Sequence, residues 1–158
     1  MGGALTLFRV LGIPVRVHAS WLVIYGLIAW SLSVGYFPQV LPDLPARTHW
    51  VSGLVAALLR FVSVFLHELS HSVVARRNGL PVAAITLHVF GGVSELAREP
   101  ESPGVEFRMA IVGPLTSFAL GGLAFVAVAL VGALLIVYAV AASGTGRHSA
   151  RFSAILAS

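Results

Sequence analysis

The chain has 158 residues, of which 58% are hydrophobic and only 10% are charged, with a formal net charge of +4. Soluble domains carry about 25% charged residues, so this composition excludes a soluble globular domain and predicts a membrane protein in contact with the lipid bilayer. The basic residues are all arginine and are scattered among apolar segments, which argues against a nucleic-acid partner.

The first half of the chain predicts a short β-hairpin and two transmembrane helices. Residues 4–18 form two roughly alternating runs around a Gly-Ile-Pro turn at 12–14, which predicts a hairpin at the membrane surface. The apolar stretch 19–37 is long enough to span a bilayer. A proline-rich loop at 38–49 separates it from a second span over about 50–74.

The second half predicts a glycine-centred hairpin and a third span. The β-rich run over about 82–96 breaks at Gly91-Gly92, which is typical of a hairpin, here associated with the membrane. The apolar stretch 109–142 is a long helix whose start Gly113-Pro114 can break, and a polar loop follows it. The fold class is therefore an all-α polytopic membrane protein, with three transmembrane helices and two hairpins in a single domain, 1–158.

The arginine distribution predicts that the N-terminus lies in the cytoplasm, because positive charge favours the inner side of a cell membrane. In this orientation six arginines lie inside and three outside. The inside set is Arg9, Arg16, Arg76, Arg77, Arg98 and Arg108, and the outside set is Arg47, Arg147 and Arg151.

The second span carries a His-Glu-x-x-His motif at residues 67–71. His67 and His71 are four residues apart and project from one helical face, so both imidazoles can bind one metal ion, for which Zn²⁺ fits best. Glu68 can then act as a general base. A polar cluster that only bridges helices is the alternative, but ionisable residues inside a span are usually functional.

Arg60 lies in the same predicted helix, seven positions before His67. Seven residues bring the helix back to nearly the same face, about 10 Å away along its axis. Two interpretations remain open. Arg60 lines the active-site cavity, or its stem extends along the helix toward the outer surface.

The sequence around the motif, FLHELSHSVVAR, resembles the active-site helix of the site-2 protease family, the intramembrane zinc metalloproteases of peptidase family M50. The segments LGIPVRVHASWL, ITLHVFGGVSEL and GPLTSFALGG also resemble that family in order and spacing, most closely its bacterial and archaeal members. The resemblance covers nearly the whole chain.

The resemblance implies regulated intramembrane proteolysis, in which peptide bonds of transmembrane protein substrates are hydrolysed. It implies that His67 and His71 bind zinc and that Glu68 is the base. It also implies that the hairpin containing Gly91 and Gly92 pairs with an unwound stretch of substrate. Ser117 stands where some relatives have asparagine, which favours a polar contact near the site.

The same resemblance implies a third zinc ligand that the sequence lacks. The family takes it from a Leu-Asp-Gly motif, whereas the one aspartate here, Asp43, lies in the loop between the first two spans. We therefore expect an N-terminal part of the membrane core, truncated at its C-terminus, with an incomplete site unless His88 or Glu95 supplies a ligand. The alternative is a non-catalytic relative that acts as a membrane binding protein. A small transporter would require an internal repeat, which the two halves lack.

Overall fold

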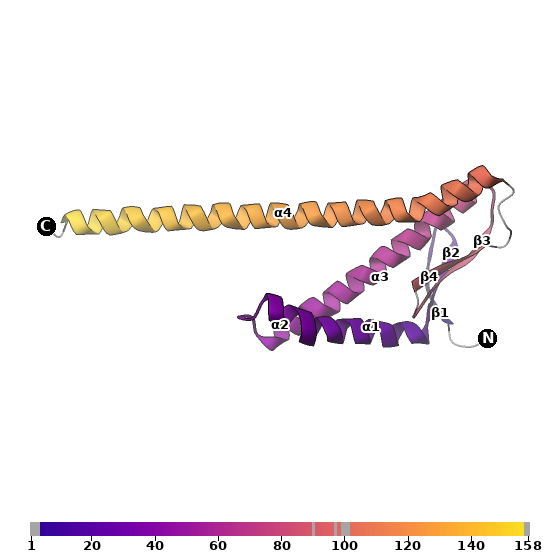
Figure 1. Ribbon diagram of the computed structural model, residues 1–158, viewed down its shortest axis with the longest axis horizontal. Helices are drawn as coiled ribbons and strands as arrows, with labels where there is room; N and C mark the ends of the chain where they lie inside the picture. Colours follow the sequence, from indigo (N-terminus) through magenta and orange to yellow (C-terminus); the bar gives the residue numbers. More distant parts are fainter. Residues whose placement is uncertain (1–3, 90, 97, 99–101, 157–158) are drawn as a thin grey trace. The chain divides into compact units, whose positions relative to one another are not determined.

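The computed structural model describes residues 4–89, 91–96, 98 and 102–156, and it is mostly helical with one small sheet (Figure 1). Three helical segments are long and apolar enough to cross a membrane, as predicted: Ala19–Val40, Ala46–Arg77 and Pro103–Ala142. The chain divides into two units, Met1–Phe118 and Ala119–Ser158. The first unit contains the sheet, the first two spans and the beginning of the third.

The N-terminal hairpin consists of β1 (Ala4–Val10) and β2 (Ile13–His18), which pair antiparallel. The turn lies at Leu11 and Gly12, with φ of 52° and 79°, so it comes earlier than the predicted 12–14 turn. Positive φ at both central residues matches the twist of the flanking strands, and it explains the glycine. Pro14 belongs to β2 instead, opposite Arg9.

The second hairpin consists of β3 (Val82–His88) and β4 (Gly91–Leu96), also antiparallel. The two predicted hairpins are not separate, because β2 pairs with β3 in parallel and gives the strand order β1-β2-β3-β4. Buried Val15 and Ile85 face each other in this register. The arrangement places β4 at the end of the sheet order, beside the helix that carries the motif.

The first span is continuous from α1 (Ala19–Ser31) through a π-helical turn (η1, Leu32–Tyr36) to α2 (Phe37–Val40), slightly longer than predicted. The second span, α3 (Ala46–Arg77), begins directly after Pro45, which is earlier than predicted. The two pack closely at Gly53, where an added Cβ would come within 2.8 Å of the Ala29 carbonyl oxygen.

The third span belongs to α4 (Pro103–Leu156), which begins before the predicted residue 109. Ser102 precedes it and accepts a 3.4 Å hydrogen bond from the Val105 amide, so the polar segment before the apolar stretch starts the helix. Pro114 lies inside α4 without ending it. The prediction of a polar loop after 142 is wrong as far as Leu156, because that segment contains no proline and can continue the helix.

Candidate metal centre

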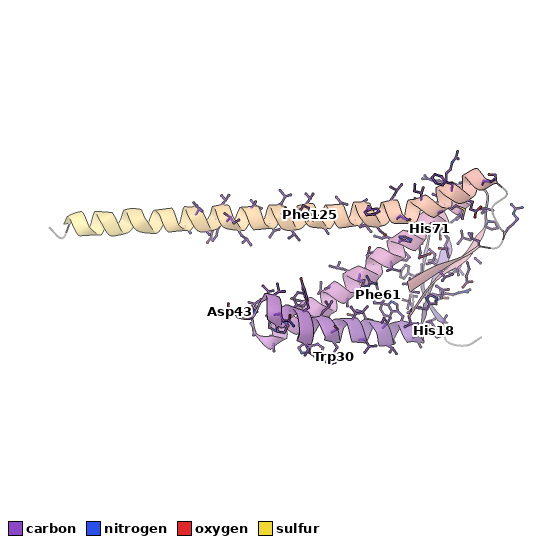
Figure 2. The ribbon with its side chains drawn as sticks, in the orientation of Figure 1. His18, Trp30, Asp43, Phe61, His71 and Phe125 are labelled. Carbon is purple, nitrogen blue, oxygen red and sulfur yellow. The ribbon has the colours of Figure 1, made fainter. Side chains whose placement is uncertain are left out.

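His67 and His71 lie one turn apart on α3, and their Nε2 atoms are 3.1 Å from each other. Two nitrogens that are each about 2.0–2.1 Å from one tetrahedral zinc ion lie about 3.3 Å apart. The pair therefore fits two ligand positions of a zinc site, and the ring centroids are 4.8 Å apart. Figure 2 shows His71 where α3 meets the beginning of α4.

The other ring nitrogens are held by α4. Nδ1 of His71 is 2.5 Å from the Met109 carbonyl oxygen, and Nδ1 of His67 is 2.9 Å from Ser117 Oγ. A carbonyl oxygen only accepts, so Nδ1 of His71 carries the proton and its Nε2 presents a lone pair. Histidine ligands of zinc normally have such a partner, which fixes the ring orientation and the tautomer.

Gly113 allows α4 to approach this pair. A Cβ at this position would overlap Nε2 of both His67 and His71. The sequence predicted only a helix break or a structural role for Gly113-Pro114, because the close approach depends on how α4 packs against α3. Ser117 follows one turn later and makes the polar contact that the resemblance implied.

Glu68 is held by β4. Ser94 Oγ lies 3.1 Å from both the carbonyl oxygen and Oε2 of Glu68, and the buried Ser72 hydroxyl donates to Ser94. A Cβ on Gly92 would come within 3.2 Å of Glu68 Cδ. Sequence reasoning missed Ser94, whose role appears only when β4 lies along α3.

Two cavities adjoin these residues, and Glu68 and Gly92 line both of them. One measures about 620 Å³ and is lined by Arg60, Ser63, Val64, His67, Glu68, Gly91, Gly92 and Ser117. The other measures about 450 Å³ and is lined by Glu68, His71, Gly92, Val93, Ser94, Leu96, Glu106, Met109 and Ala110. Arg60, Gly91 and Gly92 thus lie on the same cavity as His67 and Glu68.

The candidate substitute ligands make other contacts. Glu95 accepts a 2.9 Å hydrogen bond from Thr86 and lies 3.7 Å from Arg16, and His88 Nδ1 is 2.9 Å from the Gly91 carbonyl oxygen. Asp43 lies at the opposite end of α3 from His71 (Figure 2). Within the described ranges, no group of three or more His, Cys, Asp or Glu residues could hold a metal ion.

A profile of peptidase family M50 matches residues 55–156. The putative zinc metalloprotease Rip3 of Mycobacterium tuberculosis is 43% identical over 120 residues, which are 76% of this chain and 30% of that protein. A putative zinc metalloprotease of Synechocystis is 45% identical over 109 residues, which are 69% of this chain and 28% of that protein.

The solved structure of a site-2 protease from Methanocaldococcus jannaschii is also similar, with a TM-score of 0.56 and 31% identity. The match covers 78% of this chain and 50% of that one. Against the curated relatives, the chain spans only 28–31% of their length.

Proposed function

The chain belongs to peptidase family M50, the site-2 protease family, and we propose that it carries the catalytic centre of a zinc metalloprotease that cleaves transmembrane proteins within the bilayer. The observation that carries the proposal is the pairing of the His67 and His71 Nε2 atoms, with the Glu68 carboxylate held beside them on the same cavities. Three apolar spans agree with a multi-pass membrane protein.

His67 and His71 would hold the zinc ion through Nε2, with Met109 and Ser117 fixing their rings. Zinc, when bound, acts as a Lewis acid that polarises a scissile carbonyl and makes water more acidic. The Glu68 carboxylate accepts the proton of the attacking water and returns it to the leaving amine. Ser94 orients that carboxylate by its hydrogen bond to Oε2.

The substrate would bind along β4. This strand ends the sheet order, and all its residues except Glu95 line one or both of the two cavities that Glu68 lines. An unwound stretch of a transmembrane segment can add to such an edge through main-chain hydrogen bonds. Gly91 and Gly92 lie on a cavity that Glu68 also lines, and the missing side chain of Gly92 leaves room next to Glu68 for the substrate backbone.

A non-catalytic membrane binding protein is the second candidate. It is favoured by one observation, that the part of the chain the structure describes brings only two metal-binding side chains of the motif together. Such a protein would bind a transmembrane partner at β4 without cleaving it.

Cleavage of a reporter transmembrane protein in zinc-containing liposomes tests the proposal. The proposal predicts that any cleavage by the wild-type chain falls about 10²–10⁴-fold in Glu68→Gln, because the general base is lost. Asp43→Asn, at the far end of α3, should retain the wild-type rate. Full activity of Glu68→Gln would refute the assigned base, whereas binding without cleavage by the wild type would support the second candidate.

A further inference from the structure

Arg60 lies deep within the second span. Helix α3 has 32 residues, and at about 1.5 Å per residue Arg60 is about 21 Å from Ala46 and about 26 Å from Arg77. These distances exceed the length of one side chain, so the guanidinium does not reach either end of the helix by extending along it. A charged residue at such a depth normally faces a polar cavity or a partner.

The guanidinium of Arg60 forms no ion pair or hydrogen bond with any residue that the structure describes. The Glu68 carboxylate accepts a hydrogen bond from Ser94 through Oε2, and it forms no ion pair with Arg60 in the described part of the chain. Arginine remains charged at any physiological pH and offers five N–H donors in a planar fork. The free protein therefore holds an unused cationic donor inside its apolar span.

The cavity that Arg60 lines gives this donor a place to act. The same cavity of about 620 Å³ is lined by His67, Glu68, Gly91 and Gly92. Seven residues separate Arg60 from His67, so their Cα atoms lie about 10 Å apart along the helix axis.

We propose that Arg60 forms a carboxylate subsite, which binds an Asp or Glu side chain of the substrate about three residues from the scissile bond. The inference rests on the proposed function and specifies its substrate class. An extended chain advances about 3.3 Å per residue, so three residues cover the separation between His67 and Arg60. A carboxylate matches the planar fork through two parallel hydrogen bonds, and the pair would offset the cost of an acidic side chain inside a membrane.

Peptide binding measures the subsite independently of cleavage. The probes are fluorescent alanine–leucine transmembrane peptides with a central Gly-Gly pair and one Glu three residues before or after it, each matched by a Gln peptide. They are titrated in detergent onto the full chain carrying Glu68→Gln, which slows any cleavage about 10²–10⁴-fold. The same background then receives Arg60→Gln, Arg60→Lys or, as a matched control on the same helix, Arg47→Gln.

We expect one of the two Glu peptides to bind about tenfold more tightly than its Gln counterpart, as a charge-assisted hydrogen bond implies. Arg60→Gln should reduce this ratio to about one, Arg60→Lys should retain part of it, and Arg47→Gln all of it. The carboxylate subsite is wrong if the Glu peptide keeps its advantage over the Gln peptide in Arg60→Gln, or if the two peptides bind the parent protein equally. Either result leaves the proposed transmembrane substrate class intact. If the parent protein binds none of the peptides, the proposed substrate class is wrong and the subsite falls with it.

A second pair of probes distinguishes the source of the carboxylate. Peptides that end after the Gly-Gly pair carry either a free C-terminal carboxylate, as the cleavage product does, or an amide. We expect Arg60→Gln to leave the ratio between these two peptides unchanged. An Arg60-dependent preference for the free C-terminus, without one for the Glu side chain, would overturn the assignment to a substrate side chain.

Discussion

At the scale of single residues, Ser117 holds the ring of His67 through a 2.9 Å contact with Nδ1. Removing a partner of this kind typically costs about 10–100-fold in metal affinity. We therefore predict that Ser117→Ala weakens zinc binding by about this factor, measured by competition with a chromophoric chelator. Thr116→Ala is the matched control, because the Thr116 hydroxyl donates to Val112 within its own helix. Equal affinities in the two variants would show that Ser117 does not position the ligand.

Gly113 provides a second prediction at this scale. A Cβ at residue 113 would overlap both Nε2 atoms, so Gly113→Ala should displace α4 or the imidazoles and abolish zinc binding. A Cβ added at Gly121 would meet no atom within 4 Å, so the Gly121→Ala variant should bind zinc as the wild type does. Circular dichroism of both variants checks that the helices remain. Zinc binding by Gly113→Ala with wild-type affinity would contradict the close packing of α4 against the pair.

The chemistry of individual residues was predictable where it depends on one helix. His67, Glu68 and His71 belong to a local pattern, and the helical repeat alone brings the two imidazoles together. The sequence did not predict the roles of Gly113, Ser94 and the Met109 carbonyl, because these roles depend on which elements pack against α3. The sequence contains only a weak signal for them, a glycine or serine within an apolar run.

At the scale of elements, the span positions were predictable from apolar length, but the strand pairing was not. Each hairpin is local and carries its own turn signal, whereas the parallel pairing of Val15 with Ile85 joins segments far apart in the sequence. Two helices also begin earlier than predicted. Ser102 and Pro45 precede their first residues in polar segments, which a prediction from hydropathy leaves outside the spans.

The packing of α3 against the first span depends on Gly53. A Cβ there would overlap Ser33 Oγ and come within 2.8 Å of the Ala29 carbonyl oxygen, and a backbone atom cannot move aside cheaply. We predict that Gly53→Ala lowers the free energy of unfolding by about 1–3 kcal/mol, as overpacking does elsewhere. A Cβ added at Gly35 would meet no atom within 4 Å, so Gly35→Ala is the control. Thermal unfolding in detergent measures both, and equal midpoints would mean that the two helices do not meet at Gly53.

At the scale of the whole molecule, the orientation in the membrane follows from the arginine distribution and stays a prediction. The chain has no cysteine, so single introduced thiols can be labelled without background. With the N-terminus inside, Asn78→Cys at the end of α3 should be protected from an impermeant maleimide in intact cells. Asp43→Cys in the loop before α3 should react. The reverse pattern would show that the positive-inside argument fails here.

The central claim is that His67 and His71 together bind zinc, and a zinc titration of the purified chain in detergent tests it most directly. The account predicts one saturable site per chain, which is lost in the His67→Ala, His71→Ala double variant. The site should remain in His49→Ala, because that imidazole contacts the Leu41 carbonyl oxygen instead. Equal zinc binding by the double variant and the wild type, or no saturable site in the wild type, would contradict the assignment of this pair as the metal ligands.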